Sequence, residues 1–125
     1  MREYLIVFVG GGIGTAMRHF VNVTFVRVLG NGFPWHTAFE NLSGSFVMGV
    51  LTGYLAFKGH APQPVRLFLM TGILGGYTTF SAFSLDTMLL WERGHLIRAA
   101  LYIVLSVGGA LAGIALGLTI ARRVL

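Results

Sequence analysis

Four apolar stretches follow one another along the chain, separated by short links rich in glycine, proline and charged residues. They cover residues 4–26, 36–57, 65–91 and 96–121. An apolar run of about 20 residues is long enough to cross a bilayer as a helix. The links contain residues that end helices, among them Gly30, Pro34, Pro62 and Pro64. The pattern predicts an all-α membrane protein in which four transmembrane helices form one domain over residues 1–125.

The composition favours a lipid environment. Hydrophobic residues make up 55% of the chain and charged residues only 10%, whereas a soluble domain carries about a quarter charged residues. The net charge of +5 would suggest a nucleic-acid partner in a soluble protein. Here the basic residues are scattered near span ends, where they meet lipid headgroups. We therefore expect membrane lipid as the surroundings and no nucleic-acid partner, and the start of the chain lacks the features of a cleaved signal peptide.

The third apolar stretch contains the segment GGYTTFSAFS at residues 75–84. Glycine weakens a helix interior, and Ser and Thr side chains offer the backbone other hydrogen-bonding partners. At membrane depth, unpaired backbone groups persist only when they are buried in protein or line a wet cavity. One interpretation is a helix broken at Gly75-Gly76, as in transporters and channels that hold ions there. The other is an unbroken span with a glycine packing face.

Polar residues of the second span fall on one helical face. Thr37, Asn41 and Ser45 follow at four-residue spacing. The Asn41 amide can donate two hydrogen bonds inside a water-poor site, or it can clamp two helices together. Glu40 lies about one turn inside the same span, and His36, four residues earlier, is its expected partner.

The third and fourth spans also each carry aromatic and polar side chains on one helical face. Phe80, Phe83 and Asp86 are three residues apart, so they share a face after the expected break. An aspartate this deep must face the protein interior or a pore. Tyr102 and Ser106 are one turn apart on the last span, and their hydroxyls can form a polar track if other polar groups face them.

Small residues at four-residue spacing predict close helix packing. They occur as Gly10 and Gly14, as Ser45, Gly49 and Gly53, and as Gly109, Gly113 and Gly117. Arg18 in the first span has two interpretations. It is either an anchor that extends to the headgroups, or a cation that attracts an anion into a vestibule.

The basic residues show almost no preference for one side of the membrane. With four spans, one side carries five of them (Arg2, Lys58, Arg66, Arg122 and Arg123) and the other carries four (Arg18, Arg27, Arg93 and Arg98). Orientation depends on this asymmetry, so the chain is expected to insert both ways. Four short spans are few to enclose a pore, and we therefore expect an antiparallel homodimer. The two Gly75-Gly76 breaks could then meet and form a cation site from backbone oxygens.

On these residues, the chain resembles the small fluoride channels called Fluc or CrcB. The likeness covers nearly the whole chain, and its most specific parts are residues 75–84 and the second span with Asn41. The resemblance implies an antiparallel dual-topology dimer in the cell inner membrane, with two pores that let fluoride leave the cell passively. It implies that Phe80 and Phe83 line each pore, that Asn41 donates to the ion, and that Tyr102 and Ser106 belong to a polar track. It also implies a structural sodium ion held at the dimer interface by the backbone carbonyls of Gly75 and Thr78.

The expected site follows from this resemblance together with the residue types. The candidate pore residues are Asn41, Phe80, Phe83, Thr37, Ser81, Ser84, Tyr102, Ser106 and Asp86, with Arg18 in a vestibule. Hydroxyls, an amide and the positive edges of aromatic rings can replace the water around a small anion. The chain departs from the family pattern at Ala82, Ala110, Asp86 and Glu40, where Thr, Ser, Glu and an apolar residue are usual.

Other functions find less support in the residues. A small multidrug-resistance antiporter also has four short spans, but it needs a carboxylate embedded in the first span, and this one has no acid after Glu3. A non-transporting scaffold leaves Asn41, Asp86 and the break without a use. No enzyme is expected, because the acids and histidines show no nucleophile–base or metal-ligand spacing.

Overall fold

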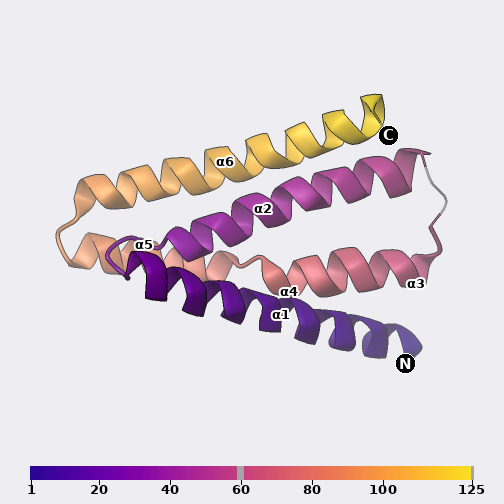
Figure 1. The fold of residues 1–125 in the computed structure, drawn as a ribbon, viewed down its shortest axis with the longest axis horizontal. Helices are drawn as coiled ribbons and strands as arrows, with labels where there is room; N and C mark the ends of the chain where they lie inside the picture. Colours follow the sequence, from indigo (N-terminus) through magenta and orange to yellow (C-terminus); the bar gives the residue numbers. More distant parts are fainter. Residues whose placement is uncertain (59–60, 125) are drawn as a thin grey trace.

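The computed structural model describes residues 1–58 and 61–124, and every regular element in these ranges is a helix. Helix α1 spans Arg2–Leu29, and α2 (Trp35–Leu51) continues into the π-helix η1 (Thr52–Lys58). The third rod consists of α3 (Gln63–Arg66), the π-helix η2 (Leu67–Leu74), α4 (Gly75–Tyr77) and α5 (Phe80–Glu92). The fourth is α6, Leu96–Arg123 (Figure 1). The prediction of an all-α protein with four helical rods is confirmed.

Within residues 1–58 and 61–124, three of the four rods are long and apolar enough to cross a membrane by length and composition: Arg2–Leu29, Gln63–Glu92 and Leu96–Arg123. The rod formed by α2 and η1 is not among these three. It is also the rod that carries Thr37, Glu40, Asn41, Ser43 and Ser45. This polar character is expected of a helix whose partners are other helices rather than lipid, and Figure 1 places it between α6 and the third rod.

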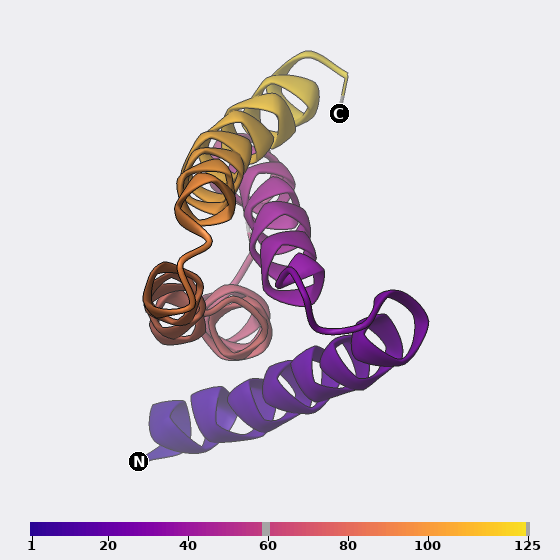
Figure 2. The same ribbon diagram turned by 90° about the vertical axis from the view of Figure 1, so that its left-hand side faces the viewer.

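The rods run antiparallel to their neighbours in sequence. The start of α1, the end of α6 and the facing ends of η1 and α3 lie at one end of the bundle, and the α1–α2 and α5–α6 links lie at the other (Figure 1). In the end-on view, α1 and α6 lie on opposite sides of the bundle (Figure 2). The alternation of helix direction from which the basic residues were counted is therefore confirmed.

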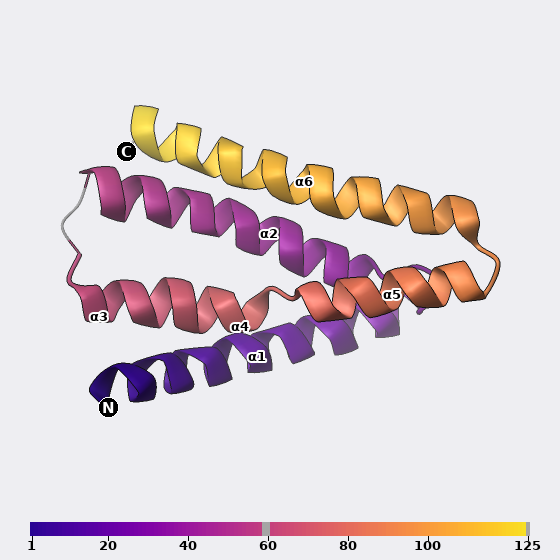
Figure 3. The same ribbon diagram turned by 180° about the vertical axis from the view of Figure 1, so that it is seen from behind.

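The third rod changes its packing partner part-way along its length. Its first half, η2 and α4, packs against α1, whereas α5 packs against α6. The change coincides with an extended link between α4 and α5 (Figure 3). The second rod crosses this link, because α2 contacts η2, α4 and α5 as well as α6. The break therefore lies at the centre of the bundle, where all four rods come together.

The break is real, but the predicted position at Gly75-Gly76 is wrong. Gly75 has helical dihedral angles (φ −62°, ψ −36°), and the extended residues are Thr78 (φ −83°, ψ 155°) and Thr79 (φ −152°, ψ 126°). Two β-branched residues favour extended backbone. Thr79 is also the N-cap of α5, since its side chain accepts a hydrogen bond from the Ala82 backbone N–H at 3.2 Å. The threonines, rather than the glycines, end one helix and start the next.

Glycines bring the helices close together, as the spacing predicted. A Cβ on Gly10 would lie 2.7 Å from the Phe68 carbonyl oxygen, and one on Gly14 would collide with the Ile73 carbonyl. Gly49 and Gly117 meet the backbone of the facing helix in the α2–α6 contact. Because a methyl group would separate these backbones, the glycine spacing sets how tightly the bundle closes.

Some predicted helix bounds are too short. Helix α1 extends to both sides of residues 4–26, and α6 continues to Arg123. Pro62 and Pro64 were expected to exclude a helix, yet α3 begins at Gln63, with Pro64 in its first turn. A proline is tolerated there because the first turn does not need its N–H. The rest of the predicted 58–64 link includes residues 59–60, which lie outside the described residues.

Candidate functional site

Asn41 holds the break in place. Its Nδ2 donates to the Thr79 carbonyl oxygen at 2.9 Å, and its Oδ1 accepts from the Thr79 N–H at 2.7 Å. The amide thereby bonds to both backbone groups of one extended residue at the junction between α4 and α5. The clamp interpretation of Asn41 is confirmed. One of the two Nδ2 hydrogens remains after the bond to Thr79, so the ligand interpretation stays compatible with this geometry.

A cavity of about 310 Å³ lies beside the clamp. It is lined by residues of α2, the break, α5 and α6: Asn41, Ser45, Thr78, Thr79, Phe80, Phe83, Ser106, Val107, Ala110 and Leu111. Four of the predicted pore residues therefore line one cavity: Asn41, Phe80, Phe83 and Ser106. Ser45, from the polar face of the second span, lines it as well. None of the lining residues is charged. The cavity therefore offers hydrogen-bond donors and ring edges without a fixed charge.

Ser106 is the most informative residue in this lining. It is only 4% exposed, and its Oγ has no hydrogen-bond partner in the described part of the chain. Buried hydroxyls nearly always have a partner, because an unsatisfied one costs about 1–3 kcal/mol. A donor left unused in a cavity wall is suited to a bound ion or water.

A chain of aromatic contacts leads away from the cavity toward the end with the α5–α6 link. The rings of Phe80 and Phe83 lie 5.4 Å apart between centroids, and those of Phe83 and Tyr102 lie 5.3 Å apart. Tyr102 is fully buried, and its hydroxyl donates to Asp86 Oδ2 at 3.0 Å. Thr37, from the second rod, is buried as well. The predicted common face of Phe80, Phe83 and Asp86 is confirmed.

Five predicted pore residues do not line this cavity. Thr37, Tyr102 and Asp86 are three of them, and Ser81 and Ser84 are the other two. Ser81 and Ser84 are exposed, and neither lines the cavity. Ser84 Oγ donates to the Phe80 carbonyl at 3.0 Å, within its own helix. Phe80 is also 76% exposed even though its ring borders the cavity. The side chains of Ser81, Ser84 and Phe80 therefore belong to an outer face of the single chain.

Arg18 extends inward to the break. Its Nε donates to the Gly76 carbonyl oxygen at 3.1 Å. This carbonyl is close to the end of α4 and so lacks a helical N–H partner. The contact matches neither interpretation of Arg18, because the guanidinium bonds to the backbone of the third rod; its role in a vestibule stays a prediction.

The predicted partner of Glu40 is wrong. His36 lies one turn away but makes no hydrogen bond to Glu40 within the described residues, and Glu40 is only 1% exposed. With its amide nitrogen turned toward the acceptors, Asn22 of α1 donates to the Glu40 carboxylate and, at 3.2 Å, to the Arg18 carbonyl. Glu40 therefore fastens α2 to α1 rather than to a residue of its own helix.

Two carbonyls at the break lose their helical donors. The Thr79 N–H, which would otherwise bond to Gly75, is taken by Asn41 Oδ1. The Ala82 N–H, which would otherwise bond to Thr78, is taken by the Thr79 side chain. Among the hydrogen bonds of the described residues, none reaches the Gly75 or Thr78 carbonyl oxygen. Hard cations such as sodium bind oxygen ligands of this kind.

Sequence reasoning missed some contacts that shape the site. Tyr77 is buried, and its hydroxyl lies 3.0 Å from Ser43 Oγ, which ties α4 to α2. The N-cap role of Thr79 could have been found, because a threonine just before an apolar helical run is a common helix start. The link between Tyr77 and Ser43 had no such signal, since the two residues are 34 positions apart.

Comparison with known proteins agrees with the geometry. The family model described as CrcB-like protein, Camphor Resistance (CrcB), matches residues 5–118. The chain belongs to the CrcB-like family.

Among curated members, it is 60% identical over 121 residues to the fluoride-specific ion channel FluC of Rhodopseudomonas palustris (strain BisB5), covering 97% of this chain and 98% of the relative. It is 58% identical to fluoride-specific ion channel FluC 2 of Nitrobacter hamburgensis, with the same coverage of both chains. It is 54% identical over 124 residues to FluC of Beijerinckia indica, covering 98% of each. These CrcB-like relatives support a channel and give no support to the antiporter alternative.

Proposed function

We propose that this CrcB-like protein is a fluoride-specific ion channel that lets fluoride cross the cell inner membrane passively, as a multi-pass membrane protein. The observation that carries the proposal is the uncharged cavity of about 310 Å³ in which Ser106 Oγ has no protein partner. The names of the relatives, which are fluoride-specific ion channels, support the same ion. Passive conduction involves no covalent step, so we infer a channel rather than an enzyme.

The cavity chemistry suits a small anion. Fluoride must exchange its water for donors, and the wall supplies the remaining Nδ2 hydrogen of Asn41 and the hydroxyls of Ser45 and Ser106. Phe80 and Phe83 add ring edges, which carry positive partial charge. A fixed cation in the wall would hold the ion too tightly for rapid passage, and the lining has none.

We further propose that two chains pair antiparallel, and that each pore is completed by the second copy. Phe80 borders the cavity and yet is 76% exposed in the single chain. Ser81 and Ser84 are exposed on the same short helix. A second copy placed on this face would bury all three side chains and close the cavity. The nearly even distribution of basic residues between the two sides supports the antiparallel arrangement.

A sodium ion at the interface of the two chains is part of the same proposal. The carbonyls of Gly75 and Thr78 would hold it, since they have lost their helical donors. Gly75 is exposed, and a Cβ built there would meet only the Met70 carbonyl, at 3.7 Å. Packing within one chain therefore does not require glycine at this position, whereas close approach of a second copy would. When bound, the cation would neutralise the partial charges of the broken ends and join the two breaks.

Fluoride efflux from liposomes tests the function. Purified protein is reconstituted into vesicles loaded with fluoride or with chloride, and release is followed with an electrode selective for the loaded anion after the membrane potential is clamped. We expect release far above that of protein-free vesicles, and no comparable release from vesicles loaded with chloride. Equal release of both anions, or of neither, would contradict a fluoride-specific channel.

A further inference from the structure

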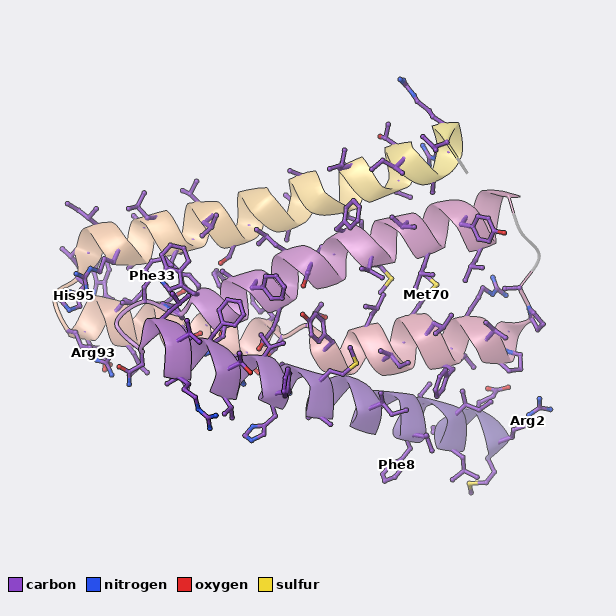
Figure 4. All side chains as sticks on the ribbon, viewed as in Figure 1. Arg2, Phe8, Phe33, Met70, Arg93 and His95 are labelled. Carbon is purple, nitrogen blue, oxygen red and sulfur yellow. The ribbon has the colours of Figure 1, made fainter. Side chains whose placement is uncertain are left out.

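A second cavity, of about 170 Å³, opens at the end of the bundle that carries the α1–α2 and α5–α6 links. Its lining comes from the first link, the start of α2 and the end of α5: Asn31, Gly32, Pro34, His36, Asp86, Leu89, Leu90 and Arg93. Figure 4 labels Arg93 at this end, together with Phe33 and His95. The cavity is thus placed at an aqueous end of the helices rather than among the apolar spans.

One layer of side chains joins this cavity to the first. Asp86 lines the second cavity and accepts the hydrogen bond of the buried Tyr102 hydroxyl at 3.0 Å. The Tyr102 ring lies against Phe83, which lines the first cavity. Phe83, Tyr102 and Asp86 therefore form a continuous line of contacts between the two cavities.

The backbone of Arg93 is held in place at the second cavity, and its exposed side chain makes no ion pair within the described residues. Arg93 caps α5, with its backbone N–H bonded to the Leu89 carbonyl at 3.1 Å. The turn is completed by Gly94, whose φ of 82° lies in the left-handed region that glycine tolerates. Although Arg93 and Asp86 line the same cavity, no ion pair joins them within the described ranges 1–58 and 61–124. The guanidinium is therefore free to face water or an anion.

We propose that this second cavity is an anion-binding mouth, in which Arg93 concentrates a small hydrated monovalent anion before it passes Tyr102. The proposal rests on the proposed fluoride channel and adds a residue to it. Uncharged donors at the same mouth are the Asn31 amide and the His36 ring. Arg93 shares the recess with the Asp86 carboxylate, so its positive charge offsets a charge that would otherwise repel an anion. This gain in the local concentration of the anion weakens as salt increases. It does not change the passage step itself, so it matters at low fluoride and disappears at saturation.

Arg93→Gln tests the mouth, with Arg98→Gln as the matched control. Arg98 is exposed at the start of α6, on the same side of the membrane, and does not line the cavity. Both variants remove one charge from the same side, so they affect orientation equally. Initial fluoride efflux from liposomes is measured at low and saturating fluoride, each at low and high ionic strength, using protein shown to elute at the wild-type size.

At low fluoride and low salt, we expect Arg93→Gln to reduce the initial rate by about two- to fivefold, the effect of one nearby charge in a watery site. The deficit should vanish at saturating fluoride and shrink in high salt, Arg93→Lys should keep the wild-type rate, and Arg98→Gln should match wild type. Equal rates for Arg93→Gln and Arg98→Gln, or a deficit that salt does not reduce, would overturn the mouth. If Arg93→Gln fails to assemble, the other two variants test the proposal. A wild-type efflux rate at low fluoride in Arg93→Glu, with the wild-type dependence on salt, would overturn the proposed mouth, and so would a reduced rate in Arg93→Lys. A wild-type protein that does not conduct fluoride would instead overturn the proposed function.

Discussion

Replacing Ser106 with alanine should separate folding from conduction. Ser106 Oγ is buried and has no protein partner, and it lies in the wall of the cavity that we propose as the pore. The substitution removes only this oxygen, on a helix whose backbone it does not support. If the hydroxyl serves packing, the substitution should lower stability and leave fluoride flux unchanged. If the hydroxyl serves conduction, the substitution should lower fluoride flux and leave stability unchanged or higher.

The magnitudes follow from the hydrogen-bond inventory. An unsatisfied buried hydroxyl costs about 1–3 kcal/mol, so its removal should leave the stability unchanged or raise it by about 1 kcal/mol. If the hydroxyl donates to the permeating anion, the lost bond to a charged group is worth about 1.5–3 kcal/mol. Each 1.36 kcal/mol is about a tenfold change in rate, so fluoride flux should fall about 10- to 100-fold.

Two measurements on one preparation test this prediction: thermal unfolding in detergent and initial fluoride efflux from liposomes. Thr119→Ala is the matched control, because Thr119 is exposed on the same helix and its Oγ1 bonds to the Ala115 carbonyl at 2.8 Å. That variant should conduct as wild type does. A Ser106→Ala protein that is clearly less stable yet conducts normally would refute our assignment, since the hydroxyl would then be a packing group.

Three further predictions concern the clamp, the cation and the orientation. Asn41→Asp keeps an acceptor for the Thr79 N–H but loses the donor to the Thr79 carbonyl, so fluoride efflux should fall sharply. The free energy of unfolding should fall by about 1–2 kcal/mol, in the range of single interhelical hydrogen bonds in membranes. Normal efflux in folded protein would contradict the role of Asn41. Exchange of sodium for a large organic cation should lower dimer stability, by about 2.7 kcal/mol relative to sodium at 100 times its dissociation constant, and an unfolding midpoint indifferent to sodium would remove the proposed site at Gly75 and Thr78. A reporter fused to the C-terminus should be found on both faces of the membrane, and two or three added lysines at one end should force one orientation and reduce efflux. A wild-type reporter on one face only would count against the antiparallel dimer.

Local pattern was enough to predict the helical rods and the residues that share a face. Phe80 and Phe83 do touch, and Ser45 and Asn41 line one cavity, because a helix repeats every 3.6 residues whatever packs against it. The glycine spacing also predicted close packing, since the absence of a side chain is a property of the residue itself. Even the presence of a break could be predicted from the composition of residues 75–84.

Only the tertiary structure decided where the break lies and which groups meet there. Asn41 bonds to a residue 38 positions away, and Arg18 to one 58 positions away. Glu40 lies against Asn22 of another helix rather than His36 of its own. Such partners are selected by how four rods cross, and a helical period contains no information about the neighbour that each face will meet. An unpaired backbone group can be predicted from a broken helix, but the side chain that satisfies it depends on which rod passes within hydrogen-bonding distance.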